Sequence, residues 1–86
     1  MNNDNLKLLY FYSPSCGSCK AYEDVVDKLS TAFKIDCEKQ NIDNVRPRHK
    51  IEGVPCIILE NNGVEIYRSL GNVKFQQVYK DMKDFV

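Results

Sequence analysis

The sequence has no net charge and only one histidine, and both absences limit the functions it can support. Its 86 residues include 12 basic and 12 acidic side chains, so it lacks the excess of positive charge that attracts nucleic acid or an acidic membrane surface. The single histidine, His49, stands in a short basic cluster and is expected to be a solvated surface group. This disfavours a cysteine hydrolase assisted by histidine. We therefore expect neither nucleic acid nor a membrane among the partners.

Long apolar segments are missing as well. No apolar run approaches the roughly 20 residues that cross a bilayer. The first residues, MNNDN, contain neither the basic nor the apolar part of a signal peptide. The length fits one small hydrophobic core. These observations predict a cytoplasmic protein with a single domain over residues 1–86.

Two of the four cysteines form the most informative motif in the chain. Cys16 and Cys19 are separated by two small residues, after an apolar run and before a helical pattern. In a chain without a secretory leader, such cysteines favour redox or metal chemistry over a disulfide framework. Cα atoms three positions apart in a helix are about 5 Å apart, which suits a disulfide. Cys16 would lie at the helix N-terminus, where unpaired N–H groups and the macrodipole favour a thiolate.

The apolar pattern predicts the element order β-α-β-α-β-β-α. The first strand is nearly all apolar, as in a strand covered on both faces, and Asn-Gly marks a hairpin between the last two strands. The predicted elements are a strand at 6–12, a helix at 17–33, a strand at 33–37, a polar loop at 38–44, a short helix at 45–50, strands at 56–60 and 64–68, and a helix at 75–86.

This layout resembles the thioredoxin superfamily. The motifs that carry the resemblance follow the family order over nearly the whole chain: FYSPSCGSCK at 11–20, GVP at 53–55, NG at 62–63 and Gly71. These residues show no counterpart of the additional N-terminal strand and helix of full-length thioredoxins, so the chain is similar to a minimal, glutaredoxin-sized member. The resemblance implies an α/β thioredoxin-like fold, with a central four-stranded mixed sheet flanked by three helices.

The resemblance also implies a thiol–disulfide oxidoreductase that reduces protein disulfides. The Cys16 thiolate would attack a partner's disulfide, and Cys19 would resolve the mixed disulfide. The implied partners are disulfide-containing proteins and a recycling system, either an unidentified reductase or glutathione. We expect a monomer with no cofactor and no metal.

Substrate binding is implied at two places on the chain. Pro55 is expected to be cis and to lie beside the first cysteine, while Val54 offers main-chain groups to an extended substrate. Tyr12, Ser15 and Gly17 are the other expected substrate-binding residues, because they flank the first cysteine in the motif.

Three positions depart from the thioredoxin pattern. Ser18 replaces the proline that usually stands between the cysteines, and Ser15 replaces the tryptophan before the first cysteine. Tyr10 occupies the position of the buried acid that assists proton transfer at the second cysteine. A water molecule, another acid such as Asp36, or no dedicated base would then serve Cys19.

Several alternatives remain open. The chain could be a glutaredoxin-type enzyme recycled by glutathione, or a redox-inert or metal-bridged module that binds peptides. A four-cysteine zinc site is disfavoured, because zinc ribbons repeat the C-x-x-C pair and this chain has one pair and two single cysteines. Cys56 is either a small buried side chain or a third redox group near Cys16, and Cys37 is expected at a strand end on the active-site edge. Lys20 either adds positive potential near Cys16 or is simply solvated.

Overall fold

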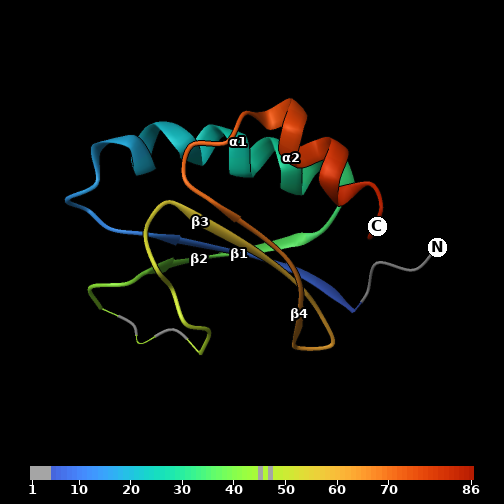
Figure 1. Ribbon diagram of the computed structural model, residues 1–86, viewed down its shortest axis with the longest axis horizontal. Helices are drawn as coiled ribbons and strands as arrows, with labels where there is room; N and C mark the ends of the chain where they lie inside the picture. The colour runs from blue at the N-terminus through green and yellow to red at the C-terminus, as the bar shows by residue number, and fades with distance from the viewer. Residues whose placement is uncertain (1–4, 45, 47) are drawn as a thin grey trace.

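The computed structural model describes residues 5–44, 46 and 48–86. Within them, the elements along the chain are β1 (Leu6–Tyr12), α1 (Gly17–Phe33), β2 (Asp36–Asn41), β3 (Cys56–Asn61), β4 (Val64–Leu70) and α2 (Phe75–Met82), as Figure 1 shows. The strands form one mixed sheet in the order β2-β1-β3-β4. β1 pairs in parallel with β2 and antiparallel with β3, and β4 pairs antiparallel with β3.

β1 lies in the interior of this sheet and contributes to both faces. Leu8 and Tyr10 are buried on the face that packs against the helices, and Leu9 and Phe11 are buried on the opposite face. The prediction of a strand over residues 6–12 that is covered on both sides is confirmed.

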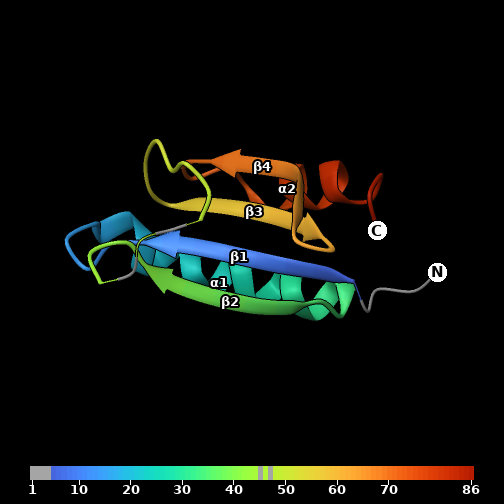
Figure 2. The ribbon, with the colours of Figure 1, turned by 90° about the horizontal axis from the view of Figure 1, so that it is seen from below.

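Both helices cover the same face of the sheet, as the two views together show (Figures 1 and 2). α1 buries Tyr22, Val26 and Leu29, which recur at helical spacing. α2 buries Val78 and Met82 in the same way. The buried faces of the two predicted helices therefore form the helix side of the main core, although α2 is shorter than predicted.

A second core cluster lies on the opposite face of the sheet, and side chains from the connection between β2 and β3 pack on it. Its buried side chains are Leu9, Phe11, Cys56 and Ile58, and the partly buried side chains packed on them are Ile42, Ile51 and Val54. Among the described residues, no helix lies on this face.

The prediction of a third flanking helix at residues 45–50 is therefore wrong where it can be compared. Residues 46 and 48–50 are not helical, while residues 45 and 47 lie outside the described part of the chain. A segment this short has little helical stability of its own. Arg48 and His49 of this segment instead bond to the sheet through their side chains.

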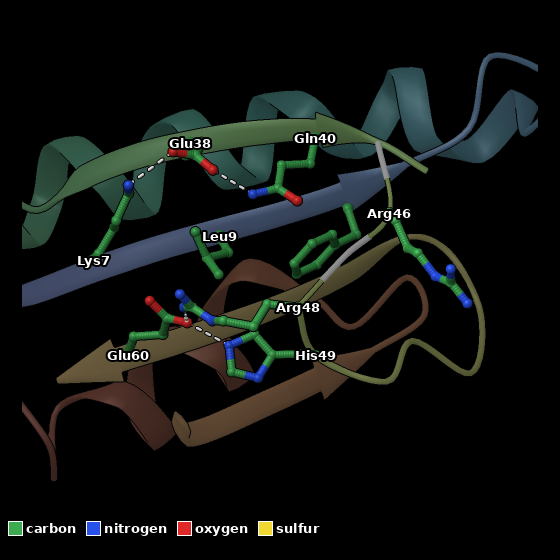
Figure 3. Close-up of a pocket in the computed structure, with 9 residues that line it drawn as sticks. Lys7, Leu9, Glu38, Gln40, Arg46, Arg48, His49 and Glu60 are labelled. Atoms are coloured by element: carbon green, nitrogen blue, oxygen red, sulfur yellow. Dashed lines mark hydrogen bonds and ion pairs between the residues drawn. The ribbon is translucent and has the colours of Figure 1, made fainter. Parts of the chain in front are cut away.

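These bonds centre on a buried carboxylate in β3 (Figure 3). Arg48 and His49 both contact the carboxylate of Glu60, whose side chain is only 4% exposed. Nδ1 of His49 also lies 3.5 Å from Oε1 of Glu65. The His49 side chain is 14% exposed, so the prediction that it is a solvated surface group is wrong. A pocket of about 320 Å³ is lined by residues that include Leu9, Phe11, Arg48, His49 and Glu60.

The second strand lies further along the chain than predicted. α1 continues through Phe33 and ends at Lys34, which adopts a left-handed conformation with φ 55°. β2 then covers residues 36–41, most of which were predicted as a polar loop. An edge strand pairs through its backbone and can leave several of its side chains in solvent, so polar residues are tolerated. Two of these polar side chains form ion pairs. Glu38 pairs with Lys7 of β1, and Lys39 pairs with Glu23 of α1.

Candidate active site

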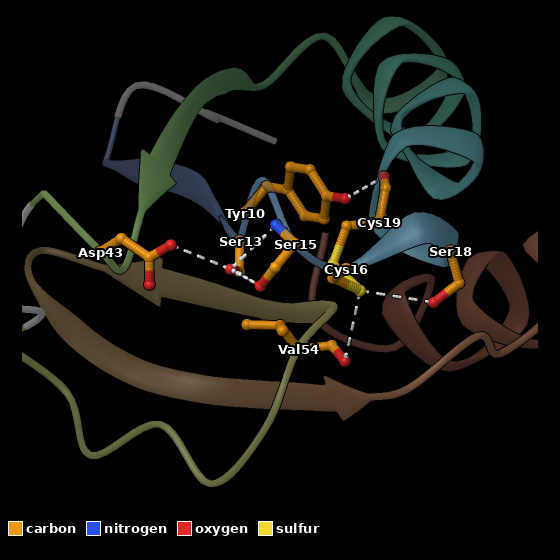
Figure 4. The surroundings of a disulfide bond; sticks show 8 residues. All are labelled: Tyr10, Ser13, Ser15, Cys16, Ser18, Cys19, Asp43 and Val54. Atoms are coloured by element: carbon orange, nitrogen blue, oxygen red, sulfur yellow. Dashed lines mark hydrogen bonds between the residues drawn. A yellow bond between two sulfur atoms is a disulfide. The ribbon is translucent and has the colours of Figure 1, made fainter.

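A short turn after β1 positions the first cysteine (Figure 4). The backbone N–H of Cys16 donates to the carbonyl of Ser13 at 3.0 Å. The Ser13 hydroxyl lies 2.9 Å from that of Ser15 and donates to Oδ2 of Asp43 at 3.1 Å. Asp43 follows β2, so the turn is anchored to both parallel strands.

Cys16 and Cys19 are joined by a disulfide, with their Cα atoms 5.3 Å apart. The spacing predicted from the sequence is confirmed, and Cys16 occupies the N-cap position of α1. Cys16 is half-buried, whereas Cys19 is 2% exposed. An approaching partner can therefore reach the sulfur of Cys16 more easily than that of Cys19.

The environment of Cys16 favours negative charge on its sulfur once the bridge opens. In α1, which the structure describes in full, no side chain caps the N-terminus and the first turn contains no acidic residue. The positive end of the helix dipole is thus uncompensated next to the sulfur. The hydroxyl of Ser18 lies 3.4 Å from Cys16 Sγ, within hydrogen-bond reach.

Val54, just before β3, points its carbonyl oxygen toward the disulfide (Figure 4). The Val54–Pro55 peptide bond is cis, and the carbonyl oxygen of Val54 lies 4.0 Å from Cys16 Sγ. The carbonyl of Pro55 accepts a 2.8 Å hydrogen bond from the N–H of Gly71, which fixes the segment to the end of β4. The structure thus brings these two sequence-predicted residues together with Cys16.

The remaining predicted residues divide into two groups. Tyr12 and Lys20 line a pocket of about 260 Å³ that also contains both cysteines of the disulfide. Ser15 and Gly17 are exposed at the turn and the first helical position.

The two free cysteines lie apart from this pocket. Cys56 is fully buried in the core of the helix-free face, and burial raises the pKa of its thiol. The prediction that Cys37 ends a strand on the active-site edge is wrong. It pairs with Leu8 near the start of β2, whereas Tyr12 and Asn41 mark the end of the sheet next to the disulfide. Burial raises the pKa of Cys37 to about 11.

Tyr10 stands where the thioredoxin pattern has a buried acid, and its hydroxyl donates to the main-chain carbonyl of Cys19 at 2.5 Å. Burial, reinforced by the nearby carboxylate of Glu23, raises the pKa of Tyr10 to about 12. It therefore stays protonated at neutral pH and cannot accept a proton from Cys19. Asp36 is also unsuitable, because it pairs with Lys7 at the far end of the sheet.

Glu23 is a pocket residue that sequence reasoning missed. It lines the pocket beside Cys19 and Lys20, although its place in the helical pattern indicates only a solvated face. The available signal was its spacing, since a residue four positions after Cys19 lies on the same side of a helix.

In the part of the chain that the structure describes, no group of three or more His, Cys, Asp or Glu side chains is placed to hold a metal ion. No helix in that part is long and apolar enough to cross a membrane.

A mixed sheet that presents a C-x-x-C disulfide at a helix N-terminus, opposite a cis-proline, defines a thioredoxin-like protein. The family model described as Thioredoxin matches residues 1–84. The chain belongs to the thioredoxin family, a family of thiol–disulfide oxidoreductases.

Relatives with curated names agree with this assignment. A thioredoxin of Haemophilus influenzae is 30% identical over 76 residues, which are 83% of this chain and 71% of the relative. The chloroplastic thioredoxin M5 of rice, Oryza sativa, is 31% identical over 71 residues, which are 77% of this chain. That alignment spans only 41% of the rice protein.

Solved structures share the fold at low sequence identity. The germline-specific thioredoxin Deadhead of Drosophila melanogaster superposes with a TM-score of 0.83 at 22% identity, over 98% of this chain and 84% of that one. A mutant thioredoxin from Halobacterium salinarum gives a TM-score of 0.82 at 21% identity, over 94% of this chain and 74% of that one. The predicted thioredoxin-like α/β fold with a four-stranded mixed sheet is confirmed, with two helices in the described residues where three were predicted.

Proposed function

We propose that this protein reduces disulfides in partner proteins through the dithiol form of Cys16 and Cys19. The observation that carries the proposal is the unequal burial of the two sulfurs at the N-terminus of α1. The more accessible cysteine suits attack on a partner, and the buried one suits an intramolecular second step. Membership of the thioredoxin family supports the same chemistry.

The proposed cycle starts from the reduced protein. The Cys16 thiolate attacks one sulfur of the partner's disulfide; a Cys16–partner bond forms, the partner's S–S bond breaks, and its other sulfur leaves with the electron pair and takes up a proton. The Cys19 thiolate then attacks Cys16 Sγ and restores the Cys16–Cys19 disulfide. The second partner sulfur leaves as a thiolate and is protonated. The partner gains two electrons and two protons, which the dithiol loses.

Substrate contacts are proposed around the accessible sulfur. The carbonyl of Val54, 4.0 Å from Cys16 Sγ, can accept a hydrogen bond from an extended partner segment laid beside Pro55. Tyr12 on the pocket side, with Ser15 and Gly17 at the exposed turn, would form the rest of the contact surface.

Auxiliary roles follow from position. Lys20 lies in the pocket with both cysteines, so its charge can favour the thiolate of Cys16. Cys56 is too deeply buried to exchange with a partner, and we assign it a packing role.

The proposed unit is a monomer acting as a single domain over residues 1–86. The described residues of one chain supply both cysteines and the Val54 carbonyl beside Cys16. We place it in the cytoplasm, where a reducing environment returns such a pair to the dithiol state. Either an unidentified reductase or glutathione supplies the electrons.

Replacing Cys19 with serine tests the proposal. Attack without resolution should leave partner proteins attached to Cys16, visible as adducts that dithiothreitol releases. Cys16→Ser is the matched control and should trap nothing. If Cys19→Ser forms no Cys16-dependent adduct with a protein disulfide such as insulin, the proposed function is wrong. Mass spectrometry of Cys16 after incubation with glutathione alone identifies the recycling system.

A further inference from the structure

The second step of the proposed cycle needs a group that removes the proton from Cys19. A thiol attacks another sulfur only as its thiolate, and burial of Cys19 disfavours the charged form. The nearest buried hydroxyl, that of Tyr10, is a donor to the Cys19 carbonyl and keeps its own proton. The acceptor must therefore reach Cys19 from elsewhere.

The pocket beside the disulfide offers one carboxylate, that of Glu23. Cys19 and Glu23 both line it, and they stand one helical turn apart on the same side of α1. The pocket volume of about 260 Å³ exceeds the roughly 30 Å³ occupied by a water molecule. Water in the pocket can link the carboxylate to the thiol where the two do not touch.

Lys39 fixes the carboxylate at the rim of this pocket. Its Nζ lies 2.9 Å from Oε1 of Glu23 and 3.0 Å from Oδ1 of Asp27, and it reaches both from β2. These two hydrogen bonds raise the pKa of Lys39, so it remains a cation throughout the working range. Glu23 and Asp27 thus share Lys39 as a partner, but only Glu23 lines the pocket beside the disulfide.

We propose that Glu23 accepts the proton of Cys19 during resolution of the mixed disulfide, held in place by Lys39. The inference rests on the proposed function. In this step the Cys19 S–H bond breaks and the proton passes to the Glu23 carboxylate, directly or through pocket water. The Cys19 thiolate attacks Cys16 Sγ, and the bond from Cys16 to the partner sulfur breaks. Glu23 then returns the proton to solvent or to the departing thiolate.

The other ionisable groups around the pocket do not fit this role. Lys39 on β2 is held as a cation by its two carboxylate partners and cannot accept a proton. Lys20 on α1 is assigned to stabilising the Cys16 thiolate through its charge. Tyr10 in β1 keeps its proton at neutral pH, because burial raises its pKa to about 12. Tyr12, at the end of β1, offers the pocket a phenol and not a carboxylate.

A chromogenic aromatic disulfide, 5,5′-dithiobis(2-nitrobenzoate), separates the two steps. When Cys16 attacks this reagent, the first coloured thiolate is released and Cys16 keeps the other half. When Cys19 resolves that mixed disulfide, the second coloured thiolate is released. We expect Glu23→Gln to leave the first release unchanged and to slow the second at least tenfold at neutral pH. The acidic inflection in the pH profile of the second release should also disappear, and Glu23→Asp should restore it.

Asp27→Asn is the matched control, because it removes the other carboxylate bonded to Lys39 and should leave both releases unchanged. The inference is overturned if the second release of Glu23→Gln keeps the wild-type rate and pH profile, or if Asp27→Asn slows it equally. A wild-type protein without any Cys19-dependent second release would instead overturn the proposed function itself, and this inference with it.

Discussion

The hydroxyl of Tyr10 in β1 donates a 2.5 Å hydrogen bond to the main-chain carbonyl of Cys19 in the first turn of α1. The thioredoxin pattern has a charged side chain at this position, and here a neutral donor occupies it. The bond joins the central strand of the sheet to the redox helix and satisfies a buried polar atom on each side. The hydrogen bond fixes the start of the helix, and the Tyr10 hydroxyl keeps its proton at neutral pH.

Replacing Tyr10 with phenylalanine should lower the free energy of unfolding by about 1 kcal/mol, the usual net value of one such hydrogen bond. Urea denaturation of the oxidised protein measures the change. Tyr12→Phe is the control, because the described residues show no hydrogen bond from that hydroxyl, and it should unfold like the wild type. Equal stabilities for the two variants would contradict this account of Tyr10.

Replacing Glu60 with glutamine should destabilise the protein by about 1–3 kcal/mol at neutral pH. Burial alone would raise the pKa of Glu60, but the hydrogen bonds from His49 and Arg48 outweigh it and leave the pKa below its ordinary value of 4.5. A carboxylate with a lowered folded-state pKa stabilises the fold above its unfolded-state value and loses that contribution as pH falls through the folded value. The difference in stability between the wild type and Glu60→Gln should therefore shrink as the pH falls into the acidic range.

Thermal unfolding of the wild type and Glu60→Gln between neutral pH and pH values below 4.5 tests this sign. The exposed Glu52 lies on the same connection before β3 and supplies the control, since Glu52→Gln should change little at any pH. A difference between wild type and Glu60→Gln that grows in acid would show that the ion cluster does not act as described.

The four cysteines of the reduced protein should differ sharply in reactivity. Iodoacetamide at mildly alkaline pH should modify Cys16 first. It should spare Cys37 and Cys56, because burial raises the pKa of both thiols, to about 11 for Cys37. Mass spectrometry of peptides taken over time measures the order, and unfolding in urea should make all four equally reactive. Alkylation of Cys56 as fast as that of Cys16 in the folded protein would reopen a redox role for Cys56.

The hairpin between β3 and β4 should depend on Gly63. Asn62 and Gly63 have φ values of 54° and 81°, which an Asn-Gly turn adopts readily. Gly63→Ala should cost about 1 kcal/mol because a Cβ atom is disfavoured at positive φ. Gly17→Ala is the matched control, since its Cβ would meet nothing within 4 Å and it lies in a helix. Thermal unfolding should place the two variants on opposite sides of the wild type or show a loss only for Gly63→Ala.

Features with a strong local signal were predictable from the sequence. β1 is apolar at almost every position, and its bounds agree with the prediction. The C-x-x-C spacing and the Asn-Gly dipeptide each restrict the backbone to few conformations, so the helix start and the hairpin also agree.

The features that sequence reasoning missed depend on contacts between distant residues. Most of β2 is predicted as a loop because its residues are polar. The strand is stabilised by backbone pairing with β1, which a polar sequence does not reveal. The segment at 45–50 is predicted as a helix from its local sequence alone. Glu60, which bonds Arg48 and His49 of that segment, lies more than ten positions further along the chain. Glu23 reads as a surface residue because the pocket it lines exists only once β1 and α1 meet.

Ile42, Ile51 and Val54, from the connection between β2 and β3, pack on the buried side chains of the helix-free face, and Val54 also lies beside Cys16. A partner that binds along Val54 therefore also holds this packing in place. A partner that binds the protein only while Val54 is packed on this face stabilises that packed state by mass action. Binding of the partner at Val54 and packing of the connection on the sheet are therefore thermodynamically linked. The backbone amides of β1 and β3 should exchange with deuterium more slowly in such a complex, and part of the partner's affinity would come from core residues that it never contacts.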